Sequence, residues 1–159
     1  MKPTVYIETT VVSYLTSRRS RDLIISAHQK QTRDWWDTQR RHFDLRTSEV
    51  VVLEASAGNP AEAAKRIAVL KQLPLLNLTA SADELAIALV KAGPIPHQSA
   101  RDALHVAVAA VNGMDYLVTW NCTHLANAAL RAKIEEVCRK SNFRAPIICT
   151  PEELFVSEP

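Results

Sequence analysis

Short stretches rich in β-branched and aromatic residues alternate along this chain with longer stretches of helical spacing, and this alternation constrains the fold more than any other feature. It predicts α/β units around a mostly parallel central sheet. Strands are expected at 4–7, 45–47, 75–78, 116–119 and 147–149. Helices are expected at about 10–15, 20–42, 48–54, 60–73, 81–92, 99–112 and 125–139, with a short one from 150.

Length and composition narrow the possible classes of protein. With 159 residues and no recognisable linker, the chain is expected to form a single domain, 1–159. Its three glycines, Gly58, Gly93 and Gly113, are too far apart for a glycine-rich phosphate-binding loop. Its three cysteines show no close pairing, which argues against a zinc knuckle or a disulfide framework.

The apolar and charged residues bear on location and partners. No stretch approaches the roughly 20 apolar residues of a membrane span, and Glu8 interrupts the apolar start that a signal peptide would need. A cytoplasmic protein without membrane contact is therefore expected. The formal net charge is only +2, yet residues 17–46 carry eight Lys and Arg against four Asp and Glu. A local basic surface is compatible with binding to nucleic acid, with a modest affinity that falls as the salt concentration rises.

Three acidic residues occupy places where a carboxylate is structurally awkward. Glu8 directly ends the first strand, at the carboxyl edge of the sheet where open α/β folds bind ligands. Glu54 lies in the otherwise apolar run 50–55, and Asp102 opens a helix that then becomes apolar. Asn121 follows the strand 116–119 and so belongs to the same edge.

Each of these residues has a purely structural alternative. Glu8 could cap the next helix, Glu54 could pair with an arginine, and Asp102 could be a helix-start acid. Taken together, three carboxylates at one edge would repel one another unless a cation lies among them. Their hard oxygen atoms suit Mg²⁺ or Mn²⁺.

In their order along the chain these residues resemble a PIN domain. The resemblance is carried by the strand followed by Glu8-Thr9-Thr10, by Ser48-x5-Glu54, by Asp102-Ala103-Leu104-His105 and by Leu117-Val118-Thr119-Trp120-Asn121. The closest similarity is to the VapC-like ribonucleases of bacterial type II toxin–antitoxin pairs, in a subgroup that begins with a strand-Glu-Thr-Thr motif. It covers nearly the whole chain, and 102–121 is its most specific block.

The resemblance implies a three-layer α/β/α fold with a central parallel sheet of four or five strands. It also implies a metal-dependent endoribonuclease that cleaves RNA phosphodiesters with Mg²⁺ or Mn²⁺. Glu8, Glu54, Asp102 and Asn121 take the four catalytic, metal-holding positions. Glu8 replaces the usual Asp, and Asn121 replaces a frequent Asp, so the site carries three negative charges and metal affinity should fall. An antitoxin protein and a second copy of the chain are the partners that the family implies.

Other residues are candidates for supporting roles. Thr9, Thr119, His105 and His124 lie close in sequence to the four positions and are candidates for orienting them. Arg18, Arg19 and Arg21 form a basic group that would contact RNA phosphates. Arg40, Arg41 and Arg46 form a second group, for which a solvated surface is the alternative. Trp35 and Trp36 are candidates for base stacking or for the core.

Two other functions compete with the ribonuclease. A catalytically weak or inactive PIN domain that binds RNA or protein is favoured by Glu8 and Asn121. An α/β phosphatase is disfavoured, because the chain lacks the DxDxT start of such enzymes.

Overall fold

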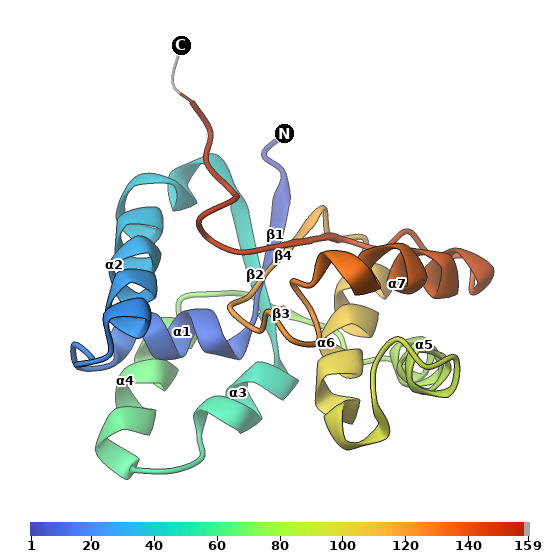
Figure 1. The fold of residues 1–159 in the computed structure, drawn as a ribbon, viewed down its shortest axis with the longest axis horizontal. Helices are drawn as coiled ribbons and strands as arrows, with labels where there is room; N and C mark the ends of the chain where they lie inside the picture. The colour runs from blue at the N-terminus through green and yellow to red at the C-terminus, as the bar shows by residue number, and fades with distance from the viewer. Residues whose placement is uncertain (158–159) are drawn as a thin grey trace.

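The computed structural model describes residues 1–157 and contains a five-stranded parallel sheet (Figure 1). The strands are ordered β3-β2-β1-β4-β5, and every neighbouring pair is parallel. They span Thr4–Ile7 (β1), Asp44–Ser48 (β2), Leu75–Leu76 (β3), Tyr116–Val118 (β4) and Ile147–Cys149 (β5). The predicted α/β class and strand number are therefore confirmed.

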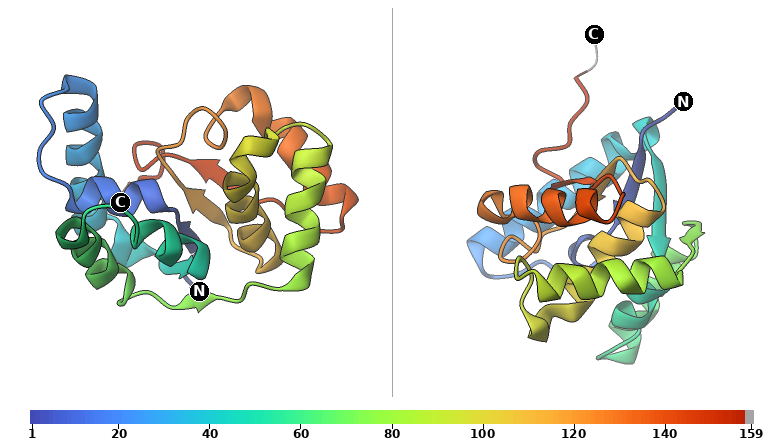
Figure 2. Two further views of the ribbon diagram at one scale, coloured as in Figure 1. Left: turned by 90° about the horizontal axis from the view of Figure 1, so that it is seen from below. Right: turned by 90° about the vertical axis from the view of Figure 1, so that its right-hand side faces the viewer.

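Seven α-helices of the described part cover the two faces of the sheet. Their bounds are Thr9–Thr16 (α1), Leu23–Thr38 (α2), Glu49–Ala55 (α3), Pro60–Leu70 (α4), Ala80–Lys91 (α5), Ala100–Val111 (α6) and Ala128–Lys140 (α7). Helices α1 to α4 lie on one face and α5 to α7 on the other (Figures 1 and 2). The three-layer α/β/α arrangement is thus as predicted.

The core forms where the apolar faces of these layers meet. Strand β1 is the central strand, and Val5, Tyr6 and Ile7 are completely buried because helices cover both of its sides. Helix α6 is the most buried helix, with an unbroken buried run from 105 to 110. Its close packing holds the helix that carries Asp102 firmly against the sheet.

The order of the strands locates a binding crevice. From β1 the chain builds β2 and β3 on one side, and then β4 and β5 on the other. The strand order therefore reverses between β1 and β4, and ligands of open α/β sheets bind outside the carboxyl ends of strands at such a point. Glu8 follows β1 there, and Thr119 follows β4.

Several predicted element boundaries were wrong, for local reasons. Helix α2 begins at Leu23, because the Asp22 carboxylate accepts hydrogen bonds from the next free amides and caps the helix there. It ends at Thr38, and a separate 3-10 turn follows at 40–42. Helix α5 is capped by Thr79 and so begins at Ala80, one residue before the predicted start. Helix α7 starts three residues late, at its Asn127 cap.

The predicted helix from Thr150 is only a turn. The Glu153 carboxylate does reach back to the backbone and hydroxyl of Thr150, both at 3.4 Å. After this turn the chain does not continue as a helix, because hydrogen bonds from α2 and from the residue after it hold the backbone there. The Trp35 indole N–H donates to the Leu154 carbonyl at 2.8 Å, and the Gln39 side chain accepts from the Val156 amide. Strand β3 is likewise shorter than predicted, pairing only through Leu75 and Leu76 at the edge of the sheet.

A candidate metal-dependent active site

Glu8 is held tightly at the carboxyl end of β1. Its backbone amide donates to Val118 O at 3.2 Å, which continues the pairing of β1 with β4. Its carboxylate accepts from the Thr10 amide at 3.0 Å, from the Thr10 hydroxyl at 2.8 Å and from the Thr119 hydroxyl at 2.9 Å. Glu8 therefore caps α1, so the structural alternative drawn from the sequence is realised.

The surroundings of Glu8 disfavour its charge. The residue is only 4% exposed. Burial raises the pKa of Glu8 above that of an ordinary glutamate, and the charge of His105 and the hydrogen bonds from Thr10 and Thr119 offset only part of this effect. A raised pKa in a buried carboxyl at a sheet edge is a common mark of functional sites.

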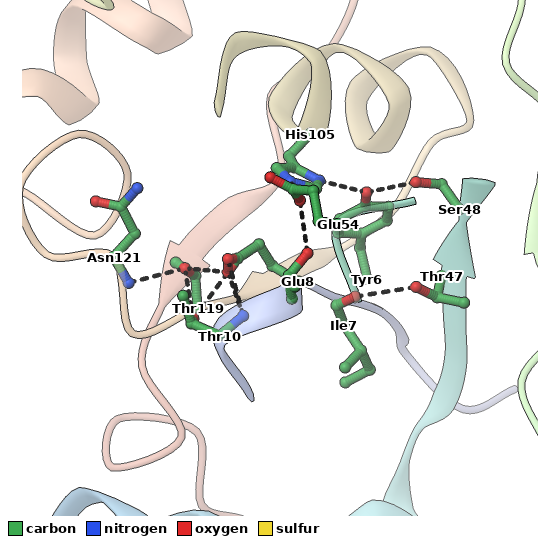
Figure 3. A network of polar contacts seen from close by, with 11 residues as sticks. Tyr6, Ile7, Glu8, Thr10, Thr47, Ser48, Glu54, His105, Thr119 and Asn121 are labelled. Atoms are coloured by element: carbon green, nitrogen blue, oxygen red, sulfur yellow. Dashed lines mark hydrogen bonds and ion pairs between the residues drawn. The ribbon is translucent and has the colours of Figure 1, made fainter. Parts of the chain in front are cut away.

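Glu54, from α3, meets two elements at once. Its Oε1 accepts from the Thr9 hydroxyl at 2.6 Å, and it is 2.6 Å from Nε2 of the α6 residue His105 (Figure 3). Burial raises the pKa of Glu54, but the hydrogen bond and charge of His105, helped by Thr9 and Arg101, outweigh burial and leave the pKa below its usual value. Glu54 is thus kept ionised.

The predicted supporting roles of Thr9 and His105 therefore have a structural counterpart. Both residues contact Glu54 directly, and the sequence did not assign either of them to that partner. His105 in turn contacts the Tyr6 hydroxyl through Nδ1 at 2.7 Å, and that hydroxyl is 2.7 Å from Ser48 Oγ. Tyr6 and Ser48 were missed by sequence reasoning, although Tyr6 lies two residues before Glu8 and hence on the same face of β1.

Asp102 and Asn121 share a second histidine. His124 Nδ1 lies 3.2 Å from Asp102 Oδ2 and 3.1 Å from the Ser99 hydroxyl. The His124 amide donates to Asn121 Oδ1 at 3.0 Å. Ser99 occupies the N-cap position of α6, but its side chain makes no cap hydrogen bond and contacts His124 instead. His124 therefore joins the helix carrying Asp102 to the loop carrying Asn121.

Threonine hydroxyls connect the two halves of this site. Thr119 Oγ1 donates to Glu8 and accepts from the Asn121 amide at 2.9 Å (Figure 3). Thr10 Oγ1 donates to Glu8 and accepts from the Trp120 amide at 2.8 Å. Glu8, the predicted supporting residue Thr119 and Asn121 thus belong to one network at the carboxyl ends of β1 and β4.

The carboxylate and amide oxygens of this network are suitable ligands for a hard cation. They are not arranged as a ready-made metal site. Within residues 1–157, no three His, Cys, Asp or Glu side chains form a group that could hold a metal ion. Each predicted carboxylate already accepts hydrogen bonds from protein groups. Oε2 of Glu54 and Oδ1 of Asp102 receive none from the described residues, and both side chains are 21% exposed. Carboxylate and amide oxygens of this kind fit Mg²⁺ or Mn²⁺.

The predicted RNA-binding arginines lie apart from the carboxylates. Arg18, Arg19 and Arg21 are exposed in the loop between α1 and α2, at the far end of α1 from Glu8 (Figure 1). A helix of that length separates its ends by about 12 Å. Trp35 cannot stack on a base, because it is fully buried against Phe43, and the face of Trp36 is covered by Arg40.

If the site were chosen by cleft volume alone, it would be placed in another part of the molecule. A cleft of about 1040 Å³ opens at the opposite edge of the sheet, beside Lys2, Asp115 and Arg144. It is lined by ordinary surface residues and contains none of the network described above. The candidate site is therefore the carboxyl edge, where buried acids and histidines gather.

Comparison with known proteins assigns this chain to no family. No protein-family model matches the chain, and no curated protein matches it in sequence. No helix of residues 1–157 is both long and apolar enough to cross a membrane.

Proposed function

We propose that this protein is a Mg²⁺- or Mn²⁺-dependent endoribonuclease. The observation that carries the proposal is the position of its acids. Glu8, Glu54 and Asp102 come from three separate parts of the chain, and they lie with Asn121 around the carboxyl edge of the sheet, beside the point where the strand order reverses.

Phosphodiester hydrolysis requires an activated water and relief of the negative charge that builds up on the phosphoryl oxygens. A cation held by Glu8, Glu54, Asp102 and the amide oxygen of Asn121 would supply both. The protein's own contribution is to hold these oxygens. Thr9 and His105 hold Glu54, and His124 holds Asp102.

RNA is the substrate that the surface charge favours. The exposed arginines 18, 19 and 21 would contact phosphates along a strand whose scissile bond lies at Glu54, one helix length away. Such contacts position a strand and carry no sequence information.

We further propose that the protein acts in the cytoplasm as the toxin of a type II toxin–antitoxin pair, held by an antitoxin and acting as a homodimer. Exposed apolar side chains on two helices are compatible with protein partners: Leu23 and Ile24 on α2, and Ile87 on α5. A small antitoxin gene directly upstream would support this role.

The decisive experiment is RNA cleavage by the purified protein with Mg²⁺ or Mn²⁺ and with EDTA. Glu54→Gln and Asp102→Asn should each lower the rate at least about 100-fold, because the cation provides several kcal/mol of transition-state stabilisation. Glu136→Gln is the matched control, since Glu136 is exposed on α7 and pairs with Lys140 of the same helix. Equal cleavage by the parent and both site variants would refute the proposal.

The alternative is an RNA- or protein-binding module without turnover. It is favoured by the burial of Glu8, whose carboxylate is already occupied as a helix cap, and by the missing charge at Asn121. Calorimetric titration with Mn²⁺ separates the two functions. Saturable binding that is lost in Glu54→Gln supports the nuclease, and no binding to a folded parent supports the module.

A further inference from the structure

A buried row of polar side chains runs from β2 to the candidate site. Ser48 Oγ is 2.7 Å from the Tyr6 hydroxyl, which is 2.7 Å from His105 Nδ1, and His105 Nε2 is 2.6 Å from Glu54 (Figure 3). Ser48 and Tyr6 are completely buried, and His105 is 1% exposed. Three polar groups are thus placed in the core between the sheet and α6.

Helix stability does not account for this row. Ser48 occupies the position of an N-cap for α3, yet its hydroxyl caps nothing and faces Tyr6. The core around Tyr6 is otherwise apolar, and a buried hydroxyl is costly unless it is hydrogen-bonded. The hydroxyls of Ser48 and Tyr6 therefore form a chain of hydrogen bonds that ends at His105.

The directions of the hydrogen bonds follow from Glu54. A carboxylate only accepts, so His105 Nε2 carries a hydrogen and donates it. In the neutral ring Nδ1 is then an acceptor, the Tyr6 hydroxyl donates to it, and the Ser48 hydroxyl donates to Tyr6. A protonated ring would donate from both nitrogens and reverse these two hydrogen bonds.

We propose that Tyr6 and Ser48 are positioning residues that fix the ring orientation and tautomer of His105, and through His105 the orientation of the Glu54 carboxylate. Glu54 is thereby held by Oε1 alone, through Thr9 and His105, and its Oε2 stays available. The consequence for cleavage rests on the proposed function, whereas the control of His105 does not.

The first test is kinetic and uses Tyr6→Phe, which removes one oxygen and keeps the ring. Loss of a group that orients a metal ligand typically costs 10- to 100-fold in activity or metal affinity. We expect kcat for RNA cleavage to fall about 10-fold or more with KM unchanged within about twofold, and Mn²⁺ to bind more weakly. Ser48→Ala should have a smaller effect in the same direction, because Ser48 is one step further from Glu54. Tyr116→Phe, at the amino-terminal end of β4, is the matched control.

The second test does not depend on activity. Nitrogen-15 NMR of the metal-free protein reads the protonation of each histidine nitrogen, and the His105 signals are assigned as those missing from His105→Asn. In the parent, Nε2 should be the protonated nitrogen. Tyr6→Phe should shift the Nδ1 signal and reduce the preference for the Nε2–H tautomer, while Tyr116→Phe leaves both signals in place.

The outcomes separate the two proposals. If Tyr6→Phe is folded and has unchanged His105 signals and unchanged Mn²⁺ affinity, the positioning role is wrong. If Tyr6→Phe fails to fold, Ser48→Ala is judged by the same two measurements. If the parent cleaves no RNA but Tyr6→Phe alters the His105 signals, the proposed function fails and the positioning role stands.

Discussion

At the scale of single residues, two threonine hydroxyls connect Glu8 to the backbone that follows β4. Thr119 Oγ1 donates to Glu8 and accepts from the Asn121 amide, and it is completely buried. Thr10 Oγ1 plays the same double role between Glu8 and Trp120. A hydroxyl can do this because it both donates and accepts, whereas a carboxylate only accepts.

Thr119→Val should therefore destabilise the fold by about 1–3 kcal/mol, because it leaves a buried carboxylate oxygen and a backbone amide without their partner while the side-chain shape is kept. Urea denaturation measures the change. Thr38→Val is the control, since Thr38 is exposed, its hydroxyl donates to the Asp34 carbonyl of its own helix, and the Gln39 side-chain amide that it accepts from is 3.5 Å away. Equal destabilisation of the two variants would show that the Thr119 hydroxyl has no special role.

The missing fourth charge gives a second prediction for a single residue. Asn121→Asp keeps the oxygen that accepts from the His124 amide and adds a negative charge beside the proposed cation. A unit charge about 4 Å away contributes roughly 1–4 kcal/mol, depending on screening, so Mn²⁺ affinity should rise about tenfold or more. Calorimetric titration of both proteins checks this. Unchanged affinity would place Asn121 outside the metal site.

At the scale of elements, β1 is tied to β4 at both ends by side chains as well as by the sheet. Near the carboxyl end the tie is Glu8 with Thr119. Near the amino end the Asp115 carboxylate accepts from the amide of Thr4 at 2.9 Å and from its hydroxyl at 3.1 Å, and Arg144 donates to it at 3.1 Å. The hydrogen bond from the Thr4 backbone is the main cause that lowers the pKa of Asp115.

This second tie should make stability depend on pH. Because the pKa of Asp115 is lower in the folded protein, its contribution is present above the unfolded value of about 3.9 and is lost as the pH falls through the folded value. The parent should be more stable than Asp115→Asn at pH 7 by less than about 1 kcal/mol, because the side chain is partly exposed. Urea denaturation at pH 7 and near pH 2.5 measures the difference. A difference that grows on acidification would contradict this account.

At the scale of the whole molecule, charge is divided between two regions. Glu8, Glu54 and Asp102 lie around the carboxyl edge of the sheet, whereas exposed arginines occupy the loop before α2. The small net charge of +2 is therefore a sum over unlike surfaces. An RNA strand would meet the basic loop first and reach the acids only where it crosses the sheet edge.

Substitution of Arg18, Arg19 and Arg21 by Ala should weaken RNA binding equally for different sequences. If each arginine contacts one phosphate, the slope of log affinity against log salt should become less steep by about 2, at roughly 0.7 per contact for a single strand. Fluorescence anisotropy over a range of salt measures the slope. Removal of three exposed lysines on α5 and α7, Lys91, Lys133 and Lys140, is the control and should change the slope less.

What the sequence determined by itself is the succession of strands and helices, and with it the position of Glu8 directly after β1. Local patterns suffice for this, because β-branched runs and helical spacing act over a few residues. The tertiary structure alone decided the partners. Ser48 and Ser99 stand at helix starts, but packing turned their hydroxyls toward Tyr6 and His124. It also brought His105 to Glu54, which lies 51 residues away in the sequence. Contacts between distant residues depend on how the sheet and helices pack, and no local pattern records that.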